Sequence, residues 1–205
     1  GPDSELAPKV VTAFANALEH WGERRPRVFF HEWKRLFGIV YGEHFAARKE
    51  EEANALSRHY GVGKDTDFQE LLFSVHTYFA YLMKLIAVEI LNIGDIAFEA
   101  SFCAKLTHLK ADEFKEALED VENGGVYARR GISNFLEGDF FRLYLDAMSP
   151  ELQDAMREVA RELSQFEPAT TTLHPRAARD LLKKLYQYLV PQPIRHKLGE
   201  YYTPD

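Results

Sequence analysis

The chain has 205 residues, which is enough for one large domain or two small ones. Hydrophobic residues make up 46% of the chain and aromatic residues 13%, so it can bury a substantial core. The formal net charge of −7 argues against a protein that coats nucleic acid generally, but it allows a local basic patch. A single cysteine, Cys103, excludes an internal disulfide framework and indicates a reducing, cytoplasmic location. The histidines show no zinc-ligand spacing, so no metal site is expected.

Apolar residues recur at helical spacing in nearly every segment, which predicts an all-α, irregular multi-helix domain of about eight helices. Residues 1–4 resemble the remnant of a cleaved tag, and we expect them to be disordered. Helix-start residues precede several of the helices, among them Ser4, Thr66 or Asp67, and Ser149-Pro150. In chain order, the expected helices cover residues 5–20, 28–41, 43–60, 67–91, 98–106, 111–121, 139–147, 150–165 and 175–190.

The longest apolar run is Leu71–Ile93, most of which lies in the helix at residues 67–91 that is expected to form the spine of the domain. Polar and charged residues interrupt it, so the sequence predicts a core helix rather than a membrane span, and no membrane partner. Two of these residues, His76 and Lys84, are candidates for a catalytic role. The alternative is that they bond to backbone carbonyls or extend to the surface.

The clearest break in the chain is Asn123-Gly124-Gly125, which is either a hinge or a plain surface loop. We therefore divide the chain into a helical subdomain at residues 5–122, around the central helix 67–91, and a second helical part at residues 126–198. Just after the break, Arg129 and Arg130 are candidates for contact with a partner.

The most basic short stretch precedes and enters the aromatic helix at residues 28–41. It predicts one positive edge that contacts DNA phosphates beside a groove. The alternative is a solvated helix face over an aromatic core. The proposed DNA-binding residues are Arg24, Arg25, Arg27, Lys34 and Arg35.

Two short motifs in the first third of the chain carry little weight. Glu32-Trp33-Lys34 matches half of a metal-dependent nuclease core, but the context is helical and only Asp3 lies upstream as an aspartate. Tyr60-Gly61-Val62-Gly63 contains a Gly-x-Gly, but a nucleotide-binding turn needs a preceding strand, and a charged helix precedes it here. We interpret the second motif as a helix C-cap and loop.

The stretch just before the final residue, Asp205, reads Leu198-Gly199-Glu200-Tyr201-Tyr202-Thr203-Pro204 and follows a basic lead-in that begins at Arg195. This string resembles the Gly-Glu/Gln-Tyr/Phe-Tyr/Phe-Thr-Pro segment of bacterial and archaeal N6-adenine DNA methyltransferases of restriction-modification and phage-defence systems. Six consecutive positions agree. In that family the segment opens the catalytic domain and helps to form the S-adenosylmethionine pocket. The resemblance therefore implies cofactor-binding roles for Tyr201, Tyr202, Thr203 and Pro204, and makes residues 199–205 the start of a methyltransferase domain that is missing here.

The family's other two sequence features are missing from this chain. It has neither a Gly-rich turn after a strand nor an Asn/Asp-Pro-Pro-aromatic loop for the flipped adenine. We therefore expect a fragment cut from a larger enzyme at Asp205, with no catalytic residues and no bound S-adenosylmethionine of its own.

The resemblance implies a function for the fragment within that larger enzyme. It would be the non-catalytic N-terminal helical domain of a DNA adenine-N6 methyltransferase, assisting the binding of DNA or of a partner subunit of a defence system. The alternative is a stand-alone helical protein–protein interaction module.

Overall fold

The computed structural model describes residues 5–20, 26–41, 50–63, 67–93, 101–133, 141–165, 187, 190 and 192–197. The described part is all-α, as the sequence predicts, and contains no strand. In chain order its elements are α1 (Leu6–His20), α2 (Pro26–Tyr41), α4 (Glu50–Tyr60), α5 (Phe68–Ile93), α6 (Phe102–His108), α7 (Ala111–Glu122), α8 (Gly125–Ala128), the 3-10 turn η1 (Leu143–Leu145), α9 (Pro150–Gln165) and α11 (Gln192–Lys197).

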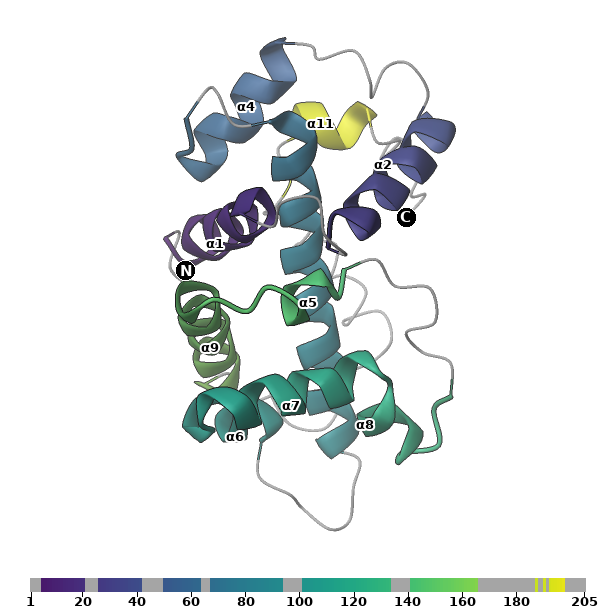
Figure 1. Cartoon of the computed structure of the whole chain (residues 1–205), viewed down its shortest axis with the longest axis vertical. Coiled ribbons are helices and arrows are strands. Elements are labelled where there is room, and N and C mark those ends of the chain that lie inside the picture. Colours follow the sequence, from purple (N-terminus) through teal and green to yellow (C-terminus); the bar gives the residue numbers. More distant parts are fainter. Residues whose placement is uncertain are drawn as a thin grey trace.

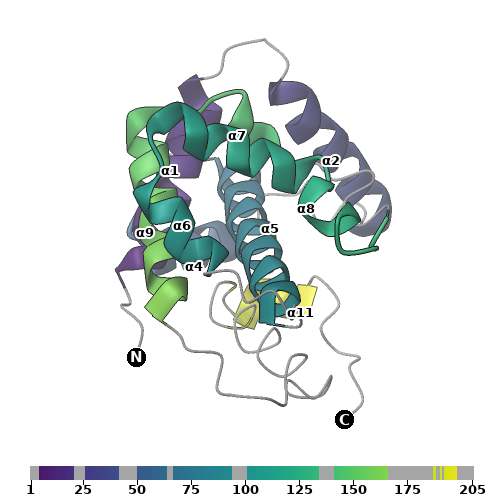
Figure 2. The same ribbon diagram turned by 90° about the horizontal axis from the view of Figure 1, so that it is seen from below.

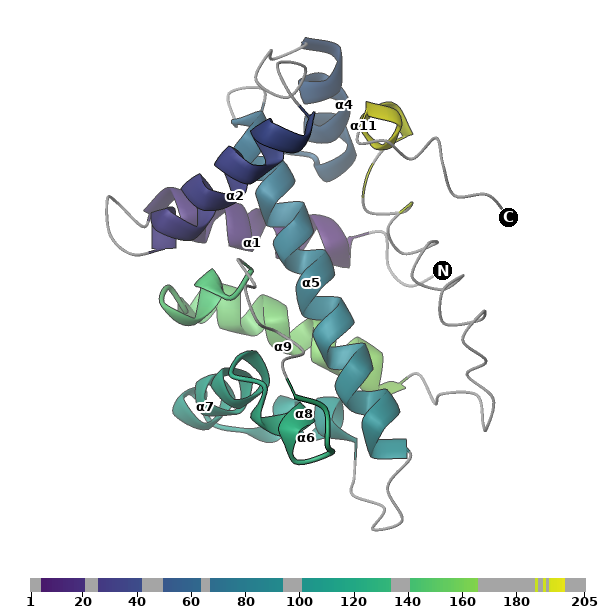
Figure 3. The ribbon, with the colours of Figure 1, turned by 90° about the vertical axis from the view of Figure 1, so that its right-hand side faces the viewer.

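Helix α5 is the axis around which the other helices are arranged (Figure 1). Helices α1 and α9 lie along one side of it and α2 lies on the other side of its N-terminal half. Helices α4 and α11 lie at its N-terminal end, and α6, α7 and α8 lie at its C-terminal end. Figure 3 shows α5 from the side, with α2 crossing it near the top and α7 and α8 near the bottom.

The helix starts follow from local side-chain capping. The Asp67 carboxylate accepts hydrogen bonds from the backbone N–H groups of Gln69 and Glu70, both at 2.9 Å. At α9, the Ser149 hydroxyl accepts from the Leu152 N–H at 3.1 Å, and Pro150 occupies the first turn. Both caps confirm the sequence prediction.

The main core crosses the boundary that the sequence analysis placed near residue 125. One cluster of buried side chains joins α1, α2, α4, α5, α6, α7, η1 and α9, and it includes Val190 and Ile194. A smaller cluster at the C-terminal end of α5 contains Val88, Val121, Val126 and Tyr127. The turn at Gly124, with φ of 76°, brings α7 and α8 together over this smaller cluster.

By length and composition, α5 is apolar enough to cross a membrane, but 67% of its most apolar window is buried inside the fold. Its side chains pack against neighbouring helices, as expected of a core helix. The Tyr81 hydroxyl, for example, donates to the Met156 carbonyl of α9 at 3.0 Å.

The sequence predicts a helix at residues 139–147, and this prediction is wrong for residues 141–147, which the structure describes. The chain there forms a turn, the short 3-10 element η1 and another turn. Leu143, Tyr144 and Leu145 are all buried. An apolar run indicates burial without fixing the backbone geometry, and this segment buries the three side chains while it packs against α2 and α7.

Other boundaries differ modestly from those expected. The charged helix is described from Glu50, since residues 42–49 lie outside the described residues. The short helix expected at residues 98–106 is α6, which begins at Phe102 because the Ser101 hydroxyl caps it. The expected helix at residues 175–190 lies almost entirely outside the described residues.

Candidate functional site

The predicted cofactor segment, Tyr201, Tyr202, Thr203 and Pro204, lies outside the described residues. The chain just before it is tied to the domain. Val190 and Ile194 are buried in the main core, and α11, which carries Ile194, packs against α4. The helical domain is therefore anchored close to the Gly199–Pro204 segment in sequence.

Three of the five predicted DNA-binding residues lie on α2 in the described part, and Arg24 and Arg25 lie outside it. The Arg27 guanidinium is 3.5 Å from the Glu70 carboxylate of α5. The Arg35 guanidinium lies 2.9 Å from Glu32 of its own helix. Because carboxylates pair with Arg27 and Arg35, this edge carries less net positive charge than the number of its arginines and lysines indicates.

Glu70 shows how mixed the charge is around this edge. Burial raises the pKa of its carboxyl above the ordinary value, and the nearby negative charge of Asp67 raises it further. The positive charges of Arg27 and Lys34 lower it in part. The fold thus brings Lys34 and Arg27 of α2 together with Glu70 of α5, so the surface offers both signs of charge to a partner.

An aromatic layer joins α2 to α5 and packs against the half-buried His76. The ring centroids of Trp33, Phe37 and Phe141 lie 5.9, 5.6 and 6.3 Å from that of His76. Burial among these rings lowers the pKa of His76 to about 4, because the charged imidazolium loses its hydration. Such a weakly basic imidazole is poorly matched to general-base catalysis at neutral pH. The position favours a packing role over a catalytic one.

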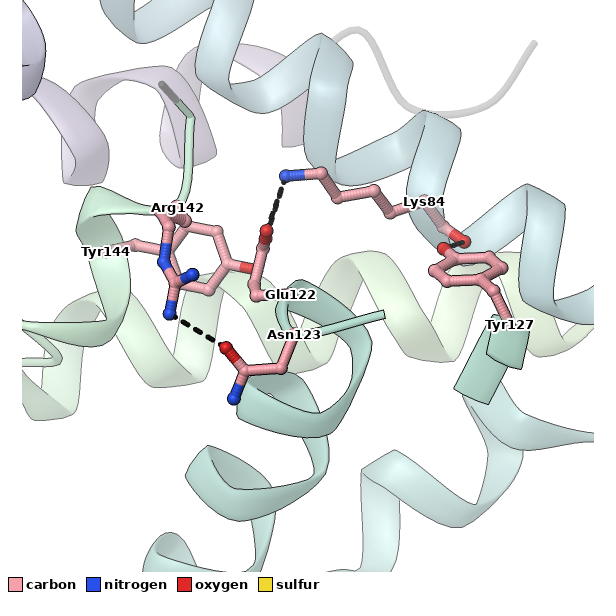
Figure 4. Close-up of polar contacts among 6 residues, drawn as sticks. All are labelled: Lys84, Glu122, Asn123, Tyr127, Arg142 and Tyr144. Carbon is pink, nitrogen blue, oxygen red and sulfur yellow. Dashed lines mark hydrogen bonds and ion pairs between the residues drawn. The ribbon is translucent and has the colours of Figure 1, made fainter. Parts of the chain in front are cut away.

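The second catalytic candidate, Lys84, lies in a buried polar cluster that links α5, α7 and η1 (Figure 4). Its ammonium donates to both carboxylate oxygens of Glu122 at 2.8 Å. The Tyr144 hydroxyl donates to the same carboxylate. The Tyr127 hydroxyl donates to the Lys84 carbonyl at 3.0 Å.

This cluster is closed to substrates. The side chain of Lys84 is 4% exposed and that of Glu122 is 0% exposed, so neither ion meets solvent. Each charge is compensated by the other, and Tyr144 supplies a further donor to the carboxylate. A satisfied, buried ion pair of this kind fixes the relative positions of the elements that carry it. We conclude that Lys84 braces the fold.

Sequence reasoning missed Glu122 as the partner of Lys84. The available signal is its position, four residues after Leu118 on the apolar face of α7. An acidic residue on one apolar face and a lysine on another are candidates for a buried pair.

The arginines after the break, which the sequence presents as candidates for partner contact, bond within the domain. Arg129 pairs with Asp120 of α7. Arg130 donates to the Leu91 carbonyl at 2.9 Å and to the Asn92 side chain at 2.8 Å, which caps the C-terminal end of α5.

No group of three or more His, Cys, Asp or Glu side chains in the described ranges could hold a metal ion. The Cys103 thiol is buried, and burial together with the Glu89 carboxylate raises its pKa well above the ordinary value, so it is a poor nucleophile. Comparison with protein-family models, characterised proteins and solved structures finds no match to this chain.

Proposed function

We propose that this chain is the non-catalytic N-terminal helical domain of an S-adenosylmethionine-dependent DNA adenine-N6 methyltransferase. The parent enzyme would belong to a bacterial or archaeal restriction-modification or phage-defence system. The observation that carries the proposal is the Gly199-Glu200-Tyr201-Tyr202-Thr203-Pro204 segment with its basic lead-in. The domain assists the binding of DNA or of a partner subunit, and methyl transfer belongs to the catalytic domain.

The anchoring of α11 is consistent with this role. Ile194 is 2% exposed and lies only a few residues before Gly199. A catalytic domain that begins at the motif would therefore be joined to the helical domain by a short connection, which limits their relative motion. S-adenosylmethionine would bind against the motif and the catalytic sheet.

The decisive test is the coding sequence downstream of Asp205. The proposal requires a strand followed by a Gly-rich turn, and then an Asn/Asp-Pro-Pro-aromatic loop. The protein made from that longer reading frame should transfer labelled methyl groups from S-adenosylmethionine to adenine in DNA. A stop codon after Asp205, or a longer frame that lacks both motifs, contradicts the proposal.

One observation favours the second candidate function, a helical interaction module unconnected with methylation. The outer face of α2 exposes large aliphatic side chains, including Val28 and Ile39. Such residues suit contact with protein better than contact with phosphates, and they would have this property whether or not a methyltransferase domain follows.

A further inference from the structure

Helix α2 carries large apolar side chains on two opposite faces. Its inner face buries Phe30 and Trp33, each 4% exposed, against the core. Its outer face exposes Val28 at 57% and Ile39 at 69%. Large aliphatic side chains that are exposed on a helix face are candidates for contact with a protein partner. Yet α2 lies at the edge of the molecule, and no described helix lies outside it (Figures 1 and 2).

The exposed residues form a line with internal symmetry. Val28, Glu32, Arg35 and Ile39 follow one another at spacings of four, three and four residues, which places them along one face of the helix. Read from either end, the line is apolar, charged, oppositely charged and apolar. Glu32 and Arg35 are already paired at its centre, 2.9 Å apart and largely exposed. We call these four residues the α2 ridge.

The ridge is self-complementary in the antiparallel direction. A second α2 laid against the first with opposite direction brings Val28 to the partner's Ile39, and Glu32 to the partner's Arg35. An isologous dimer requires this reciprocity. If one residue of the first copy contacts a second residue of the partner, the same second residue of the first copy contacts the first residue of the partner. A parallel arrangement would instead place like charges opposite each other.

We propose that the α2 ridge is the contact surface of a two-fold symmetric dimer of this chain, with the two α2 helices antiparallel. The inference does not depend on the methyltransferase assignment. One face of a 16-residue helix about 24 Å long covers only a few hundred Å². Stable interfaces bury about 800 Å² on each partner, so we expect this dimer to be weak and reversible. Nucleic acid is a poorer occupant, since aliphatic side chains donate nothing to phosphates and Glu32 repels them.

The first test is sedimentation equilibrium of the whole chain over a wide concentration range, up to the highest concentration at which the chain stays soluble. The wild-type chain should associate, and Ile39→Glu should weaken association at least about ten-fold because it buries an unpaired charge. Ile90→Glu on α5 is the matched control, since Ile90 is also exposed, at 37%, but lies off the ridge. A wild-type chain that stays monomeric overturns the proposal and leaves the ridge to another protein or to nucleic acid. Equal effects of the two substitutions overturn it as well.

The second test addresses the register. Glu32→Arg and Arg35→Glu should each associate poorly alone, because like charges then face each other across the axis. An equimolar mixture of the two should recover the dimer, since each chain then meets the opposite charge. A mixture that associates no better than its components overturns the antiparallel register.

Cysteine cross-linking tests the register directly. Cys103, the single natural thiol, is buried and gives little background. A mixture of Val28→Cys and Ile39→Cys chains should form disulfide-linked dimers faster than either variant alone, because only the mixture places two thiols in contact. Faster linkage within either single variant would show a different packing and overturn the proposal.

Discussion

The ammonium of Lys84 on α5 lies 2.8 Å from both carboxylate oxygens of Glu122 on α7, and both side chains are buried. Residues far apart in the sequence thus form one ion pair inside the core. Two opposed terms decide how much this pair contributes to the stability of the fold. Removing each ion from water costs free energy, and the attraction between the two ions offsets that cost. Removing one partner therefore has a much larger effect than removing both.

We expect Lys84→Met to lower the free energy of unfolding by about 3–5 kcal/mol, because it leaves the Glu122 carboxylate buried without its counter-ion. The double variant Lys84→Met/Glu122→Leu should recover much of that loss. Urea denaturation followed by circular dichroism measures both. Lys115→Met is the matched control, because Lys115 and Glu119 form an exposed pair on α7 at 3.9 Å, and it should change stability by less than about 0.5 kcal/mol. A double variant as unstable as the single one would show that the pair itself stabilises the fold.

His76 should make the stability of the domain depend on pH. Its pKa in the fold is about 4, below the ordinary 6.5, so below pH 6.5 the unfolded chain binds a proton that the folded chain does not. Stability is complete above that value and is lost progressively as the pH falls towards 4, with a loss of about 2 kcal/mol by pH 5. Urea denaturation at pH 7.5 and pH 5 should show this loss in the wild-type chain.

His76→Phe is the control for that measurement, because it keeps a ring among Trp33, Phe37 and Phe141 and cannot titrate. The loss of unfolding free energy between the two pH values is compared in wild type and variant. The difference between the two losses is the contribution of His76 alone, because the carboxylates that also titrate below pH 5 are present in both proteins. If the two proteins lose the same stability between the two pH values, the imidazole is hydrated in the fold and the assigned burial is wrong.

The basic edge makes a prediction for the DNA-binding enzyme that we propose. Lys34→Glu should weaken binding to all DNA sequences alike and reduce the salt slope by about one or more, since phosphate contacts carry no sequence information. The same reversal at Arg35 should have a smaller effect, because Arg35 is already paired with Glu32. Arg161→Glu on the exposed face of α9 is the control. An unchanged salt slope for Lys34→Glu would identify the edge as an ordinary solvated helix face.

The terminal motif makes a prediction about cofactor binding. Calorimetric titration of this chain with S-adenosylmethionine should show negligible binding, because only one edge of the proposed pocket belongs to it. In the longer enzyme, Tyr202→Ala and Thr203→Ala should reduce cofactor affinity. In the present chain the same substitutions should change the free energy of unfolding by less than about 0.5 kcal/mol. Loss of folding in the present chain would make the motif part of the helical core and remove the main support for the methyltransferase assignment.

Much of the fold follows from the sequence because the apolar period and the helix caps agree. Helix α5 begins one residue after its predicted cap at Asp67, and α9 begins at the predicted Pro150. The α-helix predicted at residues 139–147 was wrong because a dense apolar run indicates that residues are buried but does not determine their backbone geometry. Burial was predicted correctly there, while the 3-10 geometry depends on the helices on either side.

The candidate sites were less predictable than the helices because they depend on which helix faces pack against each other in the fold. No local pattern relates Arg27 to Glu70 or Lys84 to Glu122, since each pair joins separate helices. The symmetry of the α2 ridge is present in the sequence from Val28 to Ile39. It could be recognised only when the aromatic face of the same helix was known to point inward.

The pairing of α1 with α9 has a consequence for synthesis in the cell. The buried face of α1 packs against α5 and α9, and Lys9 of α1 pairs with Glu158 of α9. Helix α1 ends at His20 and α9 begins only at Pro150, so a ribosome needs on the order of ten seconds to deliver the second helix after the first. During that interval Val10, Phe14 and Leu18 lack part of their final cover. The nascent chain should therefore be a substrate for chaperones that bind apolar segments until translation has passed α9.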